Sequence, residues 1–590
     1  MSFSSSECAK RAPSVCWHKS QKRSKRQWFV SVSSFCRSGY KSGCEKHNRV
    51  TLNMGGFLSH LEPEINSEVL NATCGPIRGN VYRHKDKTVD GYLGIPFAEP
   101  PERFEKPIGA NVWTEVKECT KYGPGCPQSG VFEQMMDQLG LTFDEKSCLT
   151  LNVFAPRRKS DEMQNGFPVM MNIFGGGFEM GTSAAYDDYS ISGVIPLKDV
   201  ILVTLNYRVG VLGFFTTGND ISPGNLALWD QTLALKWIQK HIRSFGGDPN
   251  NVTVSGCSAG GVCADLLTLS PYSRDLFQKS ISMSGSADCE MACRSNKNQA
   301  TIFKDFAQDN GCLETDELNL LRWYQAQSIE MLYKLSAFKF SPSGFMSCAP
   351  NLDGDFFPKP LEELRGDAPK KSFIFGRTEF EGLIMAIPDP IYSRIGDNID
   401  VSSSKLFRSD VVENPDDIHK YLKTCYMEGI EKSDAPSIRK RFIEFLGDAV
   451  FNVGILNSAQ KATASGNDVY LYSFDYCNPD GYGPLGALLD FNASSHGNDF
   501  RYIFGSGGYE KFTPTEEEFH VMEKMSTLFT NFAKYGDPNG KTENKNWVKY
   551  CLEFPGNYFK IDYPTSEMND DILKEGLQKM QMIKRKKIEL

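Results

Sequence analysis

From about residue 69 onward, short apolar runs alternate with segments of helical spacing and with turns rich in Gly and Pro. Pro168–Phe174 and Val200–Tyr207 are apolar runs typical of buried strands. Leu226–Phe245 has apolar residues at helical spacing, and Asn251–Ser255 is a short β-branched strand. Strands that alternate with helices predict an α/β fold, with a large, mostly parallel, twisted central sheet flanked by helices.

The last of these strands runs into a G-x-S-x-G motif, residues 256–260 (GCSAG), and a helix-like run follows it. A serine hydroxyl is a weak nucleophile unless a base takes its proton, and it must project clear of the sheet. A sharp strand-to-helix turn achieves this, and small residues on either side relieve the crowding. The motif predicts Ser258 as a nucleophile; a glycine-rich turn with an incidental serine is the alternative.

A second glycine cluster, Gly175–Gly177, ends the apolar run at 168–174, upstream of the serine. Glycine lets the backbone approach a substrate closely and turn its N–H groups inward. Where a nucleophile stands on such a strand-to-helix turn, a loop after an earlier strand and the residue after the nucleophile supply the oxyanion hole. The expected donors are therefore the N–H groups of Gly176, Gly177 and Ala259.

A serine nucleophile needs a histidine base, and three histidines follow at a suitable distance along the chain. His419 and His520 occupy positions typical of amphipathic helices. His496 lies in a loop with Gly497 beside it, after the strand-like run at 468–476. Elimination therefore favours His496.

The acid of a triad comes between serine and histidine in this chain order. Lys371–Phe375 is strand-like, and Glu379 and Glu381 follow it. Periodicity alone does not choose between these two glutamates.

Several longer segments together resemble the type-B carboxylesterases, the group that also contains cholinesterases and neuroligins. The similar segments occur in the family's order and are GIPFAEPP (94–101), CLTLNVFAP (148–156), the long run at 224–261, FEGL (380–383) and SHGNDF (495–500). The resemblance covers roughly residues 69–560 and implies the α/β-hydrolase fold. It also selects Glu381, which precedes Gly382, as the acid.

The resemblance implies a mechanism in which Ser258 attacks an ester carbonyl and His496 takes its proton. Glu381 orients the imidazole, and an acyl-enzyme forms that water then hydrolyses. No metal and no organic cofactor is expected.

Three positions depart from the family pattern. Cys257 stands where the family usually has glutamate, and Phe174 where it has histidine or tyrosine. Lys146-Ser147 replaces an acidic pair, which puts in doubt the family's buried ion pair with Arg103. We expect activity to survive Cys257, with an altered rate or substrate range.

The family's disulfides give a further expectation. The resemblance implies a disulfide between Cys126 and Cys148. Cys312 matches one half of a second disulfide, for which Cys289 or Cys293 could be the partner.

The charge distribution separates the first 53 residues from the rest. They contain 11 Lys and Arg against two acidic residues, whereas the whole chain carries a net charge of −8. This leader, rich in Ser and Cys, reads as a transit peptide or as an extension outside the working protein, with 54–590 as a single hydrolase domain. The negative net charge of the whole chain gives no reason to expect a nucleic-acid partner.

Met54 begins MGGFLS, which fits the pattern for N-myristoylation at Gly55 if translation starts there. One acyl chain would give a weak lipid anchor. No apolar stretch is long enough to predict a membrane span. We expect an intracellular protein. Membrane association is one alternative, and location in the endoplasmic reticulum is another, because the C-terminal KIEL faintly resembles a retention signal.

The predicted function is hydrolysis of small, largely uncharged esters. A cholinesterase is disfavoured because the loop between Cys126 and Cys148 contains no tryptophan to stack on choline. An acyltransferase using the same triad is the main alternative. A neuroligin-like binding protein without activity is less favoured, since all three triad residues are present.

Overall fold

The computed structural model describes most of the chain beyond residue 67. The described residues are 16–19, 28–31, 49–52, 64–65, 68–99, 102–128, 140–158, 163–335, 346–386, 398–407, 414–507, 512–572 and 574–588. They divide into two units, one of Met1–Leu61 with Pro479–Leu488 and one of Glu62–Asn478 with Leu489–Leu590. Every predicted catalytic residue belongs to the second unit.

The second unit is built on a 12-stranded sheet in the order β20-β19-β18-β17-β14-β13-β11-β12-β10-β8-β7-β4. From β12 to β19 all neighbouring strands are parallel, and the pairs toward both edges are antiparallel. The strands are β4 Glu64–Ile65, β7 Asn80–His84, β8 Lys87–Pro96, β10 Thr150–Pro156, β11 Phe167–Ile173, β12 Ile201–Leu205, β13 Gly247–Cys257, β14 Lys279–Met283, β17 Ser372–Thr378, β18 Asp468–Phe474, β19 Tyr558–Ile561 and β20 Glu567–Asn569. The predicted α/β fold with a parallel centre is confirmed.

The apolar runs identified in the sequence are the central strands. Pro168–Phe174 corresponds to β11 and Val200–Tyr207 to β12, and every residue of both strands is buried. A parallel strand covered on both faces needs a continuous apolar run rather than an alternating one. β13 begins four residues earlier than predicted, at Gly247, and includes Asp248 and Pro249.

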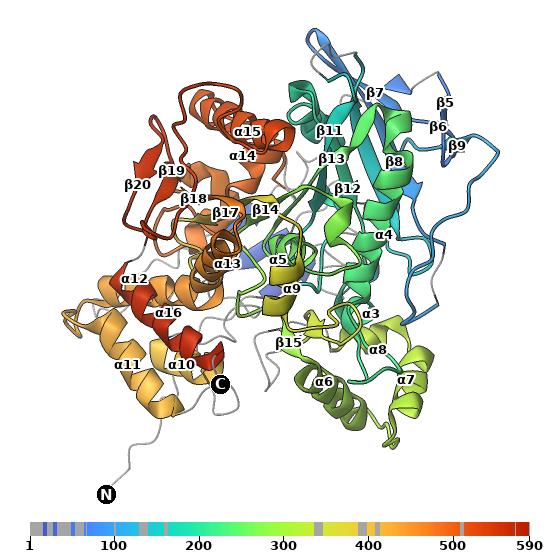
Figure 1. The fold of residues 1–590 in the computed structure, drawn as a ribbon. Helices are drawn as coiled ribbons and strands as arrows, with labels where there is room; N and C mark the ends of the chain where they lie inside the picture. The colour runs from blue at the N-terminus through green and yellow to red at the C-terminus, as the bar shows by residue number, and fades with distance from the viewer. Residues whose placement is uncertain are drawn as a thin grey trace, which may run out of the picture. The chain divides into compact units, whose positions relative to one another are not determined.

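Helices cover the sheet and connect its parallel strands (Figure 1). They are α2 Asp188–Ser192, α3 Gly210–Phe214, α4 Leu226–His241, α5 Ala259–Leu266, α6 Asn296–Asp309, α7 Glu317–Ala326, α8 Ile329–Tyr333, α9 Leu361–Asp367, α10 Ile399–Leu406, α11 Pro415–Met427, α12 Ala435–Gly447, α13 Val453–Ala464, α14 Phe500–Phe504, α15 Glu516–Tyr535 and α16 Glu575–Ile588. The helix α5 lies against β13 and β14 at the centre of the sheet (Figure 1). The predicted nucleophile therefore sits at the middle of the fold.

Small sheets accompany the large one. In the second unit, β5 Leu70–Ala72, β6 Gly75–Arg78 and β9 Lys117–Glu118 form one, and β15 Arg294–Ser295 pairs with β16 Asn351–Leu352. In the first unit, β1 Cys16–Lys19, β2 Trp28–Ser31 and β3 Arg49–Leu52 form an antiparallel sheet. The sequence of residues 1–53 has no strand periodicity, so these strands were not expected. Gly55, the predicted acylation site, lies outside the described residues.

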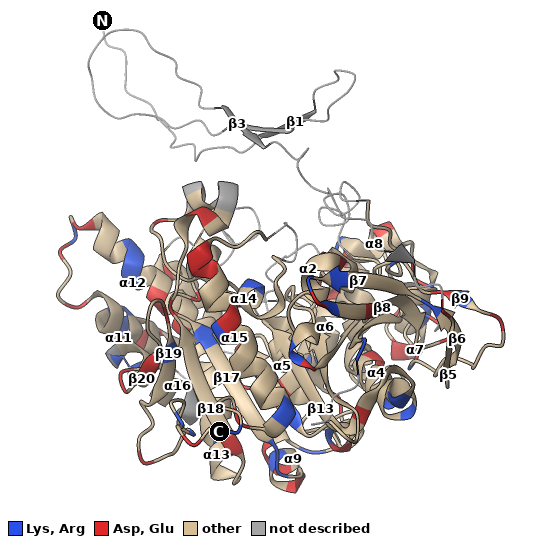
Figure 2. Ribbon diagram, turned by 90° about the horizontal axis from the view of Figure 1, so that it is seen from above, with Lys and Arg blue, Asp and Glu red and all other residues tan. Residues whose placement is uncertain are grey.

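Acidic and basic residues are interspersed along the described elements, without a large area of one sign in this view (Figure 2). Within the described part of the chain, no helix combines the length and the apolar character that crossing a membrane requires.

Candidate active site

Ser258 occupies the turn between β13 and α5 in a strained backbone conformation, with φ 59° and ψ −126°. A residue with a side chain rarely adopts positive φ, and such strain is concentrated at functional sites. The Ser258 N–H donates to the Met283 carbonyl at 2.8 Å, which ties the turn to the neighbouring strand. This is the geometry expected of a nucleophile on a strand-to-helix turn.

The glycines of the motif are required by close backbone packing. A Cβ added to Gly256 would lie 2.3 Å from the carbonyl of Gly260. A Cβ added to Gly260 would lie 2.2 Å from the carbonyl oxygen of Ile173 on β11. Neither position has room for a side chain, so the turn can form only with glycine at these two places.

The three-glycine loop lies directly beside the serine. A Cβ added to Gly175 would be 3.0 Å from the Cβ of Ser258. Gly176 and Gly177 have φ of 122° and 61°, which glycine adopts without strain. Ala259 is the first residue of α5, where backbone N–H groups are unpaired and the helix dipole favours negative charge. The structure thus brings the three predicted oxyanion donors to the same end of the sheet as Ser258.

The predicted acid and base are hydrogen-bonded to each other. His496 Nδ1 and Glu381 Oε2 are 2.6 Å apart, and the Glu381 side chain is fully buried. The other carboxylate oxygen accepts from the Ser284 hydroxyl and the Thr378 N–H, both at 2.7 Å. Because the Glu381 carboxylate accepts a hydrogen bond from Nδ1, the proton of the neutral ring is held on Nδ1, and Nε2 is left to act as a base.

The loops that carry these two residues are joined to each other and to the nucleophile turn. The Phe380 N–H donates to Ser494 O at 2.9 Å, and the Ile384 N–H donates to the Ser495 hydroxyl at 3.1 Å. A Cβ added to Gly497 would lie 3.5 Å from Cys257 Sγ. The histidine loop therefore packs against the residue that precedes Ser258.

The alternative candidates for the acid and for the base have different surroundings. Glu379 is partly exposed, and burial together with the nearby Asp475 raises the pKa of its carboxyl. His419 lies on α11 and bonds the Phe407 carbonyl at 2.8 Å, while His520 lies on α15. Neither histidine belongs to a cluster with a buried acid and a serine on a strained turn.

Comparison with known proteins shows which family the chain belongs to. The sequence profile of the Carboxylesterase family matches residues 66–580. The chain belongs to the carboxylesterase family. It is 53% identical over 521 residues to Esterase cest-33 of Caenorhabditis elegans, covering 88% of this chain and 94% of that protein. It is 32% identical over 492 residues to Carboxylesterase 1E of Mus musculus, covering 78% and 84% of the two chains.

A more distant relative is Juvenile hormone esterase of Tribolium castaneum, 31% identical over 512 residues, with 82% and 85% of the two chains covered. Membership of the family makes the chain a carboxylesterase, an enzyme that hydrolyses carboxylic esters, and confirms the α/β-hydrolase fold.

The first departure from the family pattern changes the charge of the site. Cys257 is buried, and burial together with the nearby carboxylates of Asp499 and Glu381 raises the pKa of its thiol well above its usual value. The residue before the nucleophile is therefore a neutral thiol where the resemblance leads us to expect a carboxylate.

Phe174, the second departure from the family pattern, is held in place by ring stacking. The Phe174 ring is stacked on Tyr207, with centroids 4.2 Å apart and planes at 15°. The Tyr207 hydroxyl donates to the Phe174 carbonyl at 2.8 Å. The strand end that leads into the three glycines is thereby held without a polar side chain at position 174.

The doubt about Arg103 is resolved by a neighbouring residue. Arg103 donates through Nε and Nη2 to the two oxygens of Glu145 at 2.7 and 2.6 Å. The acid lies one position before the replaced pair, so Arg103 keeps an ion pair although the usual acidic residues are absent. The Arg103 Nη1 also donates to the Gln327 carbonyl at 2.7 Å, which links this region to the end of α7.

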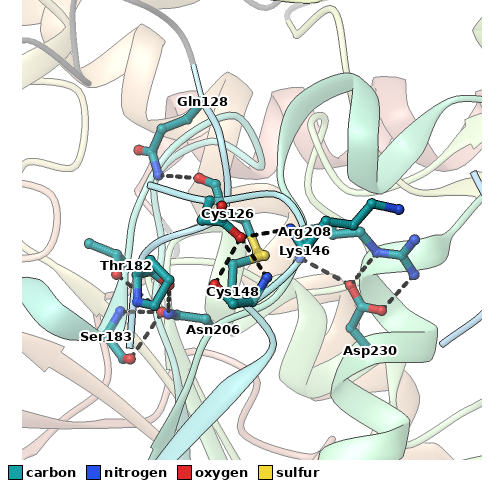
Figure 3. The surroundings of a disulfide bond; sticks show 12 residues. Cys126, Gln128, Lys146, Cys148, Thr182, Ser183, Asn206, Arg208 and Asp230 are labelled. Carbon is teal, nitrogen blue, oxygen red and sulfur yellow. Dashed lines mark hydrogen bonds and ion pairs between the residues drawn. A yellow bond between two sulfur atoms is a disulfide. The ribbon is translucent and has the colours of Figure 1, made fainter. Parts of the chain in front are cut away.

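The disulfide predicted between Cys126 and Cys148 is confirmed (Figure 3). It lies beside Gln128, which donates to the Gly181 carbonyl at 2.9 Å and accepts from the Gly181 N–H at 2.9 Å. Gly181 belongs to the segment that follows the three-glycine loop. The disulfide therefore lies next to the chain that shapes the oxyanion side of the site.

The second disulfide, for which Cys289 or Cys293 could have been the partner, is not formed: among the described cysteines, Cys312 forms no disulfide with either of them. Cys312 is buried after the end of α6, and its N–H donates to the Ala307 carbonyl at 2.9 Å.

Three further site residues were not predicted from the sequence. Ser284, with φ 49°, supplies a hydroxyl to the acid, and Phe451 stacks on the histidine ring. Asp499 is fully buried and accepts from the Tyr472 hydroxyl. The one signal for Asp499 is its place three residues after His496; the other two contacts join distant segments and leave no local pattern.

Proposed function

We propose that this carboxylesterase is a serine hydrolase that acts on small, largely uncharged esters through an acyl-enzyme. The observation that carries the proposal is the 2.6 Å contact between His496 Nδ1 and the buried Glu381 carboxylate, in a loop packed against the strained Ser258 turn. This combination supplies a nucleophile, a base and a residue that orients the base.

The reaction follows from these roles. As Ser258 Oγ forms a bond to the ester carbonyl carbon, His496 Nε2 takes the hydroxyl proton. The tetrahedral intermediate collapses, the bond to the alcohol oxygen breaks, and the imidazolium gives its proton to the leaving alcohol. Water then attacks the acyl-enzyme with His496 again as base, releasing the acid and restoring the serine.

The negative charge that develops on the carbonyl oxygen requires donors that are already in place. The proposed donors are the N–H groups of Gly176, Gly177 and Ala259; the proximity of the glycine loop to Ser258 and the place of Ala259 at the N-terminus of α5 support this assignment. Donors that need no reorganisation contribute strongly in a site from which water is excluded.

The preference for uncharged esters rests on the charge of the site. A neutral Cys257 thiol provides no anion next to the nucleophile, and no tryptophan lies between Cys126 and Cys148 to stack on a quaternary ammonium. We expect p-nitrophenyl butyrate to be hydrolysed with a kcat/KM at least about tenfold above that for butyrylthiocholine, since cation–π capture is worth about 1–2 kcal/mol.

A steady-state assay of both esters with the full chain tests this preference, with Ser258→Ala as the blank for non-enzymatic hydrolysis. A higher kcat/KM for the choline ester would contradict the proposed substrate class. Product analysis with added alcohols shows whether water or an alcohol receives the acyl group, which separates hydrolysis from acyl transfer.

A further inference from the structure

A single π-helical turn, Asp448–Asn452, connects α12 to α13. A π-turn inserts an extra residue into a helix and is frequently found at functional sites. All five of its residues are buried.

Gly447, the residue just before the π-turn, packs on the backbone that carries the predicted acid. A Cβ added to Gly447 would lie 3.0 Å from the Gly382 nitrogen and 3.4 Å from the Glu381 Cβ. A Cβ added to Gly382 would lie 2.2 Å from the Ile443 carbonyl oxygen on α12. The end of α12 and the acid loop are therefore in direct backbone contact, through glycine on both sides.

The other end of the same turn touches the predicted base. The rings of Phe451 and His496 are stacked, with centroids 4.2 Å apart and planes at 26°. The segment from Gly447 to Phe451 thus contacts both the acid loop and the base, which are 115 residues apart in the sequence.

The π-turn is itself fixed from several sides. The Asp448 carboxylate accepts from the Tyr426 hydroxyl at 2.7 Å and from Asn452 Nδ2 at 2.8 Å. The Cys289 thiol donates to the Phe451 carbonyl at 3.4 Å. Phe451 therefore has little freedom to move away from the imidazole.

We propose that Phe451 is a positioning residue for His496, and that the π-turn exists to hold its ring against the imidazole. The inference rests on the proposed serine mechanism. The Glu381 hydrogen bond fixes the imidazole at Nδ1 but leaves it able to tilt about that bond. A stacked aromatic face restricts the tilt, so Nε2 stays aligned with Ser258. The same face attracts the imidazolium more than the neutral ring, which favours the state formed once the serine proton has moved.

Replacing Phe451 with Leu removes the aromatic face and keeps an apolar side chain, whereas Phe451→Tyr keeps the ring. We expect Phe451→Leu to lower kcat for p-nitrophenyl butyrate about tenfold with KM changed less than about twofold, because the interaction is made to the catalytic ring and not to bound substrate. The rate of serine labelling by a fluorophosphonate should fall in parallel. Phe451→Tyr should keep kcat within about threefold of the wild type.

Phe445→Leu is the matched control. Phe445 is equally buried on α12, and its ring packs edge-on against Tyr426 rather than on the triad. We expect the two Leu variants to lower the thermal-unfolding midpoint to a similar extent, and only Phe451→Leu to lower kcat. If Phe451→Leu does not fold, Phe451→Met provides the same comparison.

An unchanged kcat in a folded Phe451→Leu or Phe451→Met variant would overturn the inference. So would an effect on KM alone, which would make Phe451 a substrate contact, or an equal loss of kcat in Phe445→Leu. Absence of labelling in the wild type is a different result, since it would remove the serine mechanism itself.

Discussion

Glu381 is fully buried, and separate donors occupy its two oxygens: His496 at one, Ser284 and the Thr378 N–H at the other. An amide in its place keeps the volume but carries an N–H₂ where an acceptor is needed. The imidazole then loses the partner that sets its tautomer and that stabilises its charged form.

We therefore expect Glu381→Gln to lower kcat by about 10³–10⁴ while the protein stays folded. Steady-state kinetics and a melting curve measure both quantities. Glu379→Gln, two positions earlier and partly exposed, is the matched control and should keep kcat within about twofold. Equal losses in the two variants would contradict the assignment of Glu381.

Asp499 provides a prediction about pH. Burial raises the pKa of its carboxyl to about 6, above the value of about 3.9 in an unfolded chain. The folded state thus binds this proton more tightly than the unfolded state, so the contribution of Asp499 to stability falls as the pH rises from about 4 to about 6 and stays low above that.

Asp499→Asn removes this titration while retaining an acceptor for the Tyr472 hydroxyl. The variant should have the same thermal-unfolding midpoint as the wild type near pH 4 and a higher midpoint at pH 7. At pH 7 its free energy of unfolding should be larger than that of the wild type by about 3 kcal/mol. Melting curves across this range measure the difference. Parallel curves for the two proteins would show that Asp499 does not titrate with folding.

Among the elements, the close contact between α5 and β11 constrains the nucleophile turn. Gly260 has no room for a Cβ because the Ile173 carbonyl would be 2.2 Å away. We expect Gly260→Ala to lower the free energy of unfolding by about 3 kcal/mol and to abolish activity, because the helix must move away from the strand.

Gly366 on α9 has open space around its Cβ position and is the control for adding a methyl group to a helix. Gly366→Ala should be neutral or stabilise by up to about 1 kcal/mol. Urea unfolding of both variants compares them directly. A Gly260→Ala protein as stable and active as Gly366→Ala would show that the packing of this turn is not a requirement.

At the scale of the whole molecule, local patterns predicted the parts of the fold and site that depend on local structure. Continuous apolar runs marked β11 and β12, and the small residues around Ser258 marked the turn. Loop context distinguished His496 from the helical histidines. The choice of Glu381 over Glu379 needed the family resemblance, because both follow the same strand.

What the sequence could not predict depends on long-range contacts. Ser284 reaches Glu381 across 97 residues, and Phe451 reaches His496 from a π-turn that no apolar periodicity announces. The Arg103 ion pair survives because Glu145, one residue from the replaced pair, can reach the same guanidinium. Such substitutions leave the interaction intact while altering the motif by which it is recognised.

Labelling the purified full chain with a fluorophosphonate probe, followed by peptide mass spectrometry to map the adduct, tests whether Ser258 is a nucleophile activated by His496 and Glu381. This requires no choice of ester. We expect one adduct, on Ser258, that is lost in His496→Ala although that variant remains folded. Folded wild-type protein that takes up no label, or that is labelled at a residue other than Ser258, would contradict it.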